Sequence, residues 1–256
     1  MRRVVFNQKG GVGKSTITCN LAAVAADRGR RTLVVDLDPQ ANSSRYLLGP
    51  AADTLARSVA DFFAQTLTLR LNHDPAEHYV VPSGQPGLDV LPANGSLEEL
   101  MGKLEARYKI FKLREGLDEL AETYDEIWID TPPALNFYTR SALIAAERCL
   151  IPFDCDDFSR RALYGLIESV AELKADHNAQ LEIEGIVVNQ FQARASLPRQ
   201  VVDELSAEGL PVLAPYLSSS IKVRESHQRH LPMIRLDRRH KLTGEFEALY
   251  DTLSRG

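Results

Sequence analysis

The chain has few cysteines and no long hydrophobic run, and these absences exclude several classes of protein. Its 256 residues include three cysteines, Cys19, Cys149 and Cys155, with no CxxC spacing among them. That usage argues against a disulfide framework or a zinc site and fits a reducing compartment. No apolar stretch reaches the roughly 20 residues of a membrane-spanning helix. Arg2 and Arg3 lead into too short an apolar stretch for a signal peptide, so we expect a cytoplasmic protein.

Internal repeats, low-complexity segments and linkers are also missing, which favours a single domain over residues 1–256. What is present is an ordinary globular composition, with 44% hydrophobic and 25% charged residues. The net charge of -5 does not by itself suggest nucleic acid. Its distribution is polarised, however, because residues 194–241 carry nine Lys or Arg against five Asp or Glu.

Short apolar runs alternate with amphipathic stretches along the chain, and this predicts an α/β fold. The predicted strands are Arg3–Phe6, Thr32–Asp36, Leu88–Leu91, Glu126–Asp130, Cys149–Pro152, Ile183–Asn189 and Val212–Leu217. The predicted helices are Ser15–Arg28, Ala41–Leu48, Leu97–Arg107, Phe111–Thr123, Arg160–Asp176 and Pro198–Glu208. The alternation indicates a mostly parallel, twisted sheet flanked by helices on both faces. Asn72–Gln85, with two prolines and a glycine, is expected to be an irregular surface connection.

One glycine-rich segment lies between the first predicted strand and the first predicted helix, which is the context a phosphate-binding loop requires. Glycines let backbone N–H groups turn toward phosphate oxygens, and a helix N-terminus adds partial positive charge. We expect Lys14 to pair with β- and γ-phosphate oxygens, Ser15 to ligate Mg²⁺ and Thr16 to contact the α-phosphate. The predicted nucleotide contacts are Lys9, Gly10, Gly11, Val12, Gly13, Lys14, Ser15 and Thr16.

The loop departs from the generic pattern, because Gln8 stands where glycine is usual and Lys9 adds a second lysine. In this form it resembles the deviant Walker A motif of the ParA/MinD group of P-loop ATPases. The resemblance implies a P-loop NTPase fold, ATP and ADP as ligands, Mg²⁺ and an ATP-dependent homodimer. It also gives Lys9 a catalytic role at the partner's nucleotide and places Gly10 where the two subunits approach closely. A cation supplied in this way neutralises charge on the transferring phosphoryl group.

Acidic residues follow two of the predicted strands. Asp36 and Asp38, within Asp36–Gln40, point the same way along an extended chain. This segment resembles the family's switch segment, which implies that Asp36 supports the magnesium shell and that Asp38 orients the attacking water. A simple Asp-Pro turn into the next helix is the alternative. Asp130 ends an apolar strand in the Walker B arrangement, where the carboxylate holds a magnesium-bound water.

Two other strand ends carry polar residues. Asp125 and Glu126 lie at the opposite end of the strand from Asp130 and are expected to be solvated. Asn189 ends a later strand, and its amide offers both a donor and an acceptor for the edge of adenine. It matches a family position that often contacts the base. A plain strand-ending asparagine is the alternative.

The basic second half suggests what such a switch acts on. Asn189–Arg194 and Ile221–Ser226 resemble DNA-contacting stretches of the family, although Ser218–Ser220 replace its usual Pro-Arg-Asn run. The resemblance implies DNA binding without sequence preference, through phosphate neutralisation that weakens with salt. Scattered surface charge is the alternative. The predicted DNA contacts are Arg194, Arg199, Lys222 and Arg224.

The closest resemblance is to small, Soj-like ParA partition ATPases. It implies a switch that dimerises with ATP, associates with the nucleoid and is reset when a ParB-like or other adaptor stimulates weak hydrolysis. Eight residues precede Lys9, so no N-terminal helix-turn-helix extension is expected. The alternative is a MinD-like or protein-cluster-positioning ATPase that acts without DNA, although the acidic residues of the tail 242–256 argue against a membrane. An iron–sulfur reductase like the nitrogenase iron protein, or a metabolic P-loop enzyme, is a more distant alternative.

Overall fold

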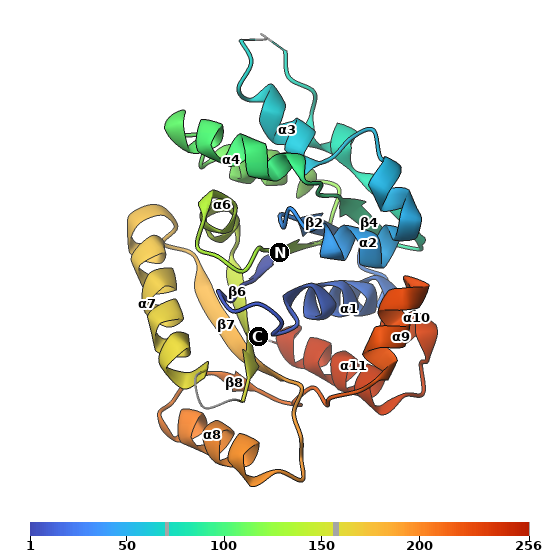
Figure 1. Ribbon diagram of the computed structural model, residues 1–256, viewed down its shortest axis with the longest axis vertical. Coiled ribbons are helices and arrows are strands. Elements are labelled where there is room, and N and C mark those ends of the chain that lie inside the picture. The colour runs from blue at the N-terminus through green and yellow to red at the C-terminus, as the bar shows by residue number, and fades with distance from the viewer. Residues whose placement is uncertain (70–71, 156–158, 256) are drawn as a thin grey trace.

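The computed structural model describes residues 1–69, 72–155 and 159–255, and these form an eight-stranded sheet between two layers of helices (Figure 1). The strands are β1 (Arg2–Val5), β2 (Thr32–Asp36), β3 (Val81–Gln85), β4 (Leu88–Leu91), β5 (Glu126–Asp130), β6 (Arg148–Asp154), β7 (Glu182–Asn189) and β8 (Val212–Leu213). Their order is β3-β4-β2-β5-β1-β6-β7-β8. Neighbouring strands are parallel except for β3 and β4. The predicted α/β fold is therefore confirmed.

The helices divide between the two faces of the sheet. They are α1 (Lys14–Asp27), α2 (Asn42–Leu48), α3 (Val59–Gln65), α4 (Ser96–Ala106), α5 (Lys112–Leu120), α6 (Phe137–Ala145), α7 (Ser159–His177), α8 (Ser196–Ala207), α9 (Lys222–Arg229), α10 (Met233–Leu236) and α11 (Lys241–Leu253), with 3-10 turns η1 (Gly49–Thr54) and η2 (Ala76–Tyr79). Side chains of α1, α2, α10 and α11 build one core, whereas those of α3 to α8 build the other. Within the described residues, no helix is both long and apolar enough to span a membrane.

The central strands carry unbroken apolar runs beside their polar ends because both of their faces are covered. All five residues of β5 are buried. Ile127 and Ile129 pack into the core under α3 to α8, whereas Trp128 between them packs against α1 and α11. Successive side chains of a strand point to opposite faces, so a strand buried on both sides needs an unbroken apolar run.

Two predictions about the extent of elements are wrong. Asn72–Gln85 is not wholly irregular, because it contains η2 and the antiparallel edge strand β3. Proline and glycine are tolerated there since an edge strand leaves some backbone groups unpaired. The strand predicted over Val212–Leu217 is only two residues long. Pro215 follows shortly after it and has no N–H to continue a ladder.

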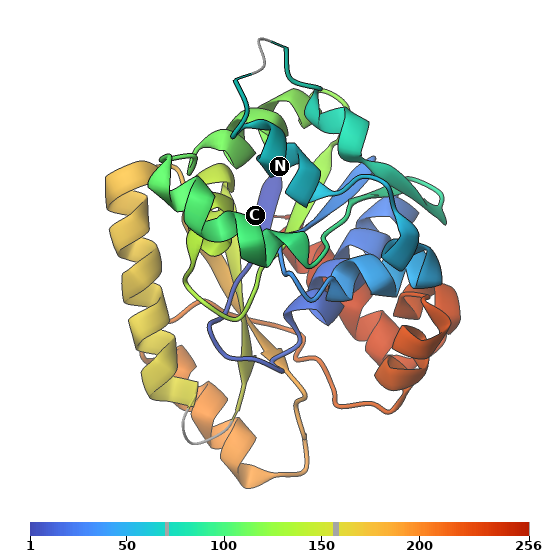
Figure 2. The same ribbon diagram turned by 45° about the horizontal axis from the view of Figure 1, so that its top comes forward.

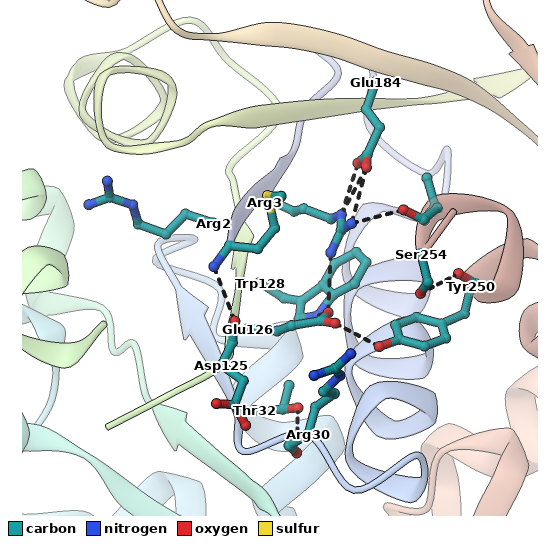
Figure 3. Close-up of polar contacts among 12 residues, drawn as sticks. Arg2, Arg3, Arg30, Thr32, Asp125, Glu126, Trp128, Glu184, Tyr250 and Ser254 are labelled. Carbon is teal, nitrogen blue, oxygen red and sulfur yellow. Dashed lines mark hydrogen bonds and ion pairs between the residues drawn. The ribbon is translucent and has the colours of Figure 1, made fainter. Parts of the chain in front are cut away.

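The expectation that Glu126 is solvated is also wrong, since it is only 8% exposed. Its carboxylate accepts hydrogen bonds from Tyr250 Oη at 2.6 Å and Trp128 Nε1 at 3.1 Å. Arg3 lies 3.2 Å from the same carboxylate, 2.9 Å from Glu184 and 5.1 Å from the centre of the Trp128 ring. Figure 3 shows this cluster at the amino ends of the strands. The partners come from β1, β7 and α11, which the local sequence around Glu126 does not indicate.

Candidate functional site

The predicted nucleotide and magnesium residues meet at the carboxyl edge of the sheet. β1 leads into the glycine-rich loop and α1, β2 ends at Asp36, β5 at Asp130 and β7 at Asn189. Asp36 pairs in register with Asp130 on the neighbouring strand. Parallel strands place their carboxyl ends at one edge, so segments far apart in the sequence present polar groups to the same space.

The glycine-rich loop is held in shape from within and from β7. Gly11 and Gly13 have φ of 78° and 91°, values that favour glycine. A Cβ at Gly13 would also lie 2.2 Å from Asn189 Nδ2. Asn189 Nδ2 donates to the Val12 carbonyl oxygen at 2.9 Å, and Gln190 Nε2 donates to that of Gly11 at 3.2 Å. The carbonyl oxygens are therefore engaged by β7 and its following residue, which fixes the orientation of the loop peptides.

The two lysines of the loop lie together. Lys14 is 7% exposed, and its Nζ donates to the Lys9 carbonyl oxygen at 3.2 Å. Burial lowers the pKa of Lys14, while the charges of Asp130 and Asp38 oppose that shift. The Lys9 N–H donates to Asn7 Oδ1 at 2.9 Å, and Asn7 Nδ2 donates to a carbonyl oxygen of β6 at 2.7 Å. A buried ammonium near two carboxylates suits the binding of a polyanion.

Asp130 is fully buried beneath the start of α1. Ser43 Oγ donates to its Oδ2 at 2.7 Å. Burial raises the pKa of Asp130 to about 6, and hydrogen bonding by Ser15 and Ser43 opposes the rise. Its Oδ1 makes no hydrogen bond of ordinary geometry with the described residues. A buried carboxylate oxygen of this kind, close to the Ser15 hydroxyl, fits a hard cation such as Mg²⁺.

Asp36 organises the turn that carries Asp38. Its Oδ2 accepts hydrogen bonds from Ser44 N at 2.8 Å and Ser44 Oγ at 2.7 Å, and its Oδ1 accepts one from Asp38 N at 3.1 Å. Burial, followed by the charge of Asp130, raises the pKa of Asp36 to about 8. Asp38 is 6% exposed, and its Oδ1 accepts from Gln40 N at 2.9 Å. Asp36 thus acts on the site through Asp38, and its own part in the magnesium shell stays a prediction.

Two cavities adjoin the loop. The first, of about 360 Å³, is lined by Lys14, Ser15, Thr16, Asp38 and His227 among others. The second, of about 330 Å³, is lined by Thr16, Asn189, Gln190, Ser218, Ser219, Ser220 and Phe246 among others. Thr16 borders both cavities, so a phosphate chain in the first could continue into a nucleoside in the second.

The metal ligands expected for such a site are few. In the part of the chain that the structure describes, no three His, Cys, Asp or Glu side chains gather in a metal-binding group. A phosphate-bound Mg²⁺ takes one or two protein ligands and fills the remaining positions with water and phosphate oxygens. Ser15 and Asp130 fit that requirement.

Several residues of the site were missed in the sequence. Ser43 and Ser44 hold the two buried carboxylates, and Gln190 holds the loop. His227 lies 3.0 Å from Thr16 Oγ1. The serines come within four residues of the Asp36–Gln40 segment, so their position was a usable signal. His227 is 211 residues from Thr16 and offered none.

The four predicted DNA contacts do not form one cluster. Arg194 is exposed just before α8, and Arg199 is exposed in the first turn of that helix. Lys222 and Arg224 belong to α9. The two views place α8 and α9 on different sides of the molecule (Figures 1 and 2). Lys222 pairs with Glu225 at 2.8 Å, which offsets its charge. DNA binding by these residues stays a prediction.

Fold and site together define a P-loop nucleoside triphosphatase: a mostly parallel sheet, a glycine-rich loop that opens a helix, and a buried Lys–Asp pair. A family model described as an AAA domain matches residues 3–183. The chain belongs to the ParA/Soj family of P-loop ATPases, and it is an ATP hydrolase of that family.

Two relatives support this membership, and one solved structure shares the fold. The chain is 37% identical over 202 residues to the chromosome partitioning protein ParA of Myxococcus xanthus, covering 78% of this chain and 69% of that protein. It is 35% identical over 232 residues to the chromosome-partitioning ATPase Soj of Thermus thermophilus, covering 88% and 84%. Cobyrinic acid a,c-diamide synthase from Mycobacterium smegmatis, solved with an ATP analogue and magnesium, matches with a TM-score of 0.85 and 26% identity, covering 99% and 94%.

Proposed function

We propose that the chain is an ATP-driven dimerisation switch that binds DNA without sequence preference and partitions or positions a chromosome, plasmid or other cargo. The observation that carries the proposal is the convergence of the two-lysine loop with Asp38 and Asp130 at one edge of the sheet. The printed names of the partition relatives support the cargo class. ATP, ADP and Mg²⁺ are the proposed ligands, supported by the ligands of the solved relative.

The role proposed for each residue is supported by its surroundings. Lys14, whose charged form two nearby carboxylates favour against the effect of burial, binds the β- and γ-phosphate oxygens. Ser15 and Asp130 would hold Mg²⁺, and that ion would neutralise charge on the phosphates. Asp38 lines the phosphate cavity and orients the attacking water. Asn189 borders the second cavity, where it contacts the base.

Gly10 supports the proposed dimer. It is exposed, its φ is not positive, and a Cβ added there would meet nothing within 4 Å. Nothing within the described residues therefore requires glycine at this position. A second copy that approaches the loop closely would require it, and in such a dimer Lys9 reaches the partner's nucleotide.

The remaining parts of the proposal concern partners and place. We infer that residues 1–256 form a single domain and that an adaptor of the ParB type stimulates hydrolysis. The nucleoid is the proposed location within the cytoplasm, with no membrane partner. Arg194, Arg199, Lys222 and Arg224 are the proposed DNA contacts, and duplicating them in a dimer would strengthen phosphate neutralisation.

Binding to a random-sequence DNA duplex tests the proposal, measured with ATP, ADP or no nucleotide over a series of salt concentrations. We expect binding with ATP alone, and a loss of roughly tenfold or more between about 50 and 200 mM salt. Arg194→Ala should weaken binding, whereas Arg57→Ala, at an exposed arginine near η1, should not. Lys14→Ala should abolish nucleotide binding, and Asp38→Ala should trap the DNA-bound dimer.

Two outcomes would contradict parts of this proposal. Dimerisation with ATP but no DNA binding at any salt concentration would refute the DNA role and favour a protein or membrane cargo. Normal ATP turnover by Asp38→Ala would refute the role assigned to Asp38.

A further inference from the structure

His227 connects helix α9 to the phosphate loop. Its Nε2 lies 3.0 Å from Thr16 Oγ1, and its ring lines the 360 Å³ cavity with Lys14 and Asp38. The ring stacks on Tyr46, with centroids 4.0 Å apart and planes inclined by 11°. The imidazole therefore faces the space in which phosphates are expected, and it is held there by an aromatic partner.

The surroundings of His227 leave its ring little freedom. Ser226, the preceding residue, is fully buried, and its Oγ donates to the Leu231 carbonyl oxygen at 2.7 Å and contacts Tyr46 Oη. Asn20 Nδ2 of α1 donates to Tyr46 Oη at 3.1 Å. One polar network thus joins α1, α2 and α9. A ring fixed in this way loses little entropy when it makes a hydrogen bond.

The protonation of the ring decides what it does for Thr16. Burial, followed by the neighbouring His230, lowers the pKa of His227. Near neutral pH the ring is therefore uncharged, with one N–H and one unprotonated nitrogen. Thr16 has one hydroxyl hydrogen and two acceptor lone pairs. When Nε2–H donates to Thr16 Oγ1, the hydroxyl hydrogen remains available for an anionic oxygen in the cavity. In the other tautomer, His227 Nε2 would accept the hydroxyl hydrogen of Thr16. Thr16 Oγ1 would then present only a lone pair to the phosphate.

We propose that His227 is a positioning residue for the nucleotide: its Nε2–H donates to Thr16 Oγ1 and directs the Thr16 hydroxyl toward the α-phosphate. The inference rests on the proposed nucleotide site and extends it to α9. The α-phosphate is common to ADP and ATP, so both ligands depend on His227 to the same degree. His227 touches no reacting atom, so it acts on affinity and leaves the chemical step unchanged.

Calorimetric titration with ADP and Mg²⁺ tests this proposal through three variants. His227→Phe retains a ring for stacking on Tyr46 but has no donor, and we expect roughly five- to tenfold weaker binding of ADP. His227→Gln restores an N–H at the position of Nε2 and should recover most of the affinity. Gln228→Ala, at an exposed position of the same helix, is the matched control and should bind as the wild type does. ATP turnover should show a raised KM and an unchanged kcat in His227→Phe.

A double-mutant cycle with Thr16→Val shows whether His227 acts through Thr16. We expect His227→Phe to cause no further loss of ADP affinity once the Thr16 hydroxyl is absent. An equal loss in both backgrounds, or undiminished affinity in His227→Phe, would overturn the proposal. If His227→Phe does not fold, His227→Met supplies a second variant without a donor. Failure of the wild type to bind ADP would instead refute the nucleotide site itself.

Discussion

At the scale of single residues, the site depends on two carboxyl groups in surroundings that disfavour their charge. Asp36 and Asp130 are both fully buried on neighbouring strands, and burial raises the pKa of each, to about 8 and about 6. The ammonium of Lys14 favours the charged form of Asp130. A bound cation would do the same more strongly, because it adds charge beside the carboxylate. Ionisation of both carboxyl groups near neutral pH is therefore unfavourable unless a cation lies beside them.

Asp36 should make the stability of the ligand-free protein depend on pH. In the folded chain its carboxyl remains protonated up to about pH 8, whereas its ordinary value is 3.8. The unfolded state therefore releases the proton first, and the free energy of unfolding falls as pH rises between these values, by at most about 1.4 kcal/mol per pH unit. Asp36→Asn removes this contribution. Thermal unfolding of both proteins from pH 5 to 8, without nucleotide or Mg²⁺, measures it.

The comparison depends on the difference in the free energy of unfolding between wild type and Asp36→Asn, because other groups titrate in both proteins alike. As pH rises, the variant should become more stable relative to the wild type. A difference that stays constant from pH 5 to 8 would mean that Asp36 is ionised in the folded protein.

At the scale of elements, the connection between β8 and α9 forms a wall of the second cavity. Ser218–Ser220, which replace the Pro-Arg-Asn run of the DNA-contacting stretch in the family, border the cavity beside the phosphate loop. Ser218 N and Oγ donate to the two oxygens of Glu245 at 2.8 and 2.7 Å, and Lys241 Nζ donates to Ser218 Oγ at 2.9 Å. A proline at this position has no N–H for Glu245. Helix α11 therefore fixes the cavity wall through contacts that serine permits.

Glu245→Ala should loosen that wall and weaken ADP binding about fivefold, since two hydrogen bonds to Ser218 are lost. Binding of inorganic pyrophosphate should change less, because it does not occupy the second cavity. Glu247→Ala, on the same helix but 3.8 Å from Arg28 at the surface, is the matched control. Fluorescence titration of each variant with both ligands makes the measurement, and equal losses for ADP and pyrophosphate would contradict the role of the wall.

At the scale of the whole molecule, the residues that form the nucleotide site and the buried ion pairs that stabilise the fold lie at opposite ends of the strands. The nucleotide site lies at the carboxyl ends of the strands, and the buried cluster of Arg3, Glu126 and Glu184 lies at the amino ends (Figure 3). Arg3 also donates to the Leu253 carbonyl oxygen at 3.2 Å, so the cluster joins β1, β5 and β7 to the end of α11. Such a cluster ties both ends of the chain to the centre of the sheet.

Arg3→Met should therefore destabilise the fold by about 3–5 kcal/mol, because it leaves the buried Glu126 and the half-buried Glu184 without the positive charge that they share. Chemical denaturation measures this loss. Arg31→Met is the control, since Arg31 is exposed, its partner Asp125 is only half-buried, and such a surface pair contributes little to stability. ADP affinity of the folded fraction should remain near that of the wild type, and a loss of stability no larger than that of Arg31→Met would contradict the importance of the cluster.

The sequence by itself determined the phosphate loop, the family and most of the sheet, because these depend on local signals. Glycines at 11 and 13 are required where φ is positive, and Thr32–Asp36, Leu88–Leu91 and Glu126–Asp130 are strands with the bounds that their apolar runs predict. The acids of the site could be found because each ends or follows such a strand.

Only the tertiary structure decided which residues complete the site. The contact of Ser43 with Asp130 spans 87 residues, and that of His227 with Thr16 spans 211. It also decided that Glu126 is buried and that Ser218–Ser220 border a cavity. A residue whose role depends on a partner so distant in the chain has no periodicity or spacing of its own to reveal it. The parallel sheet creates these contacts, because it gathers the ends of separate strands at one edge.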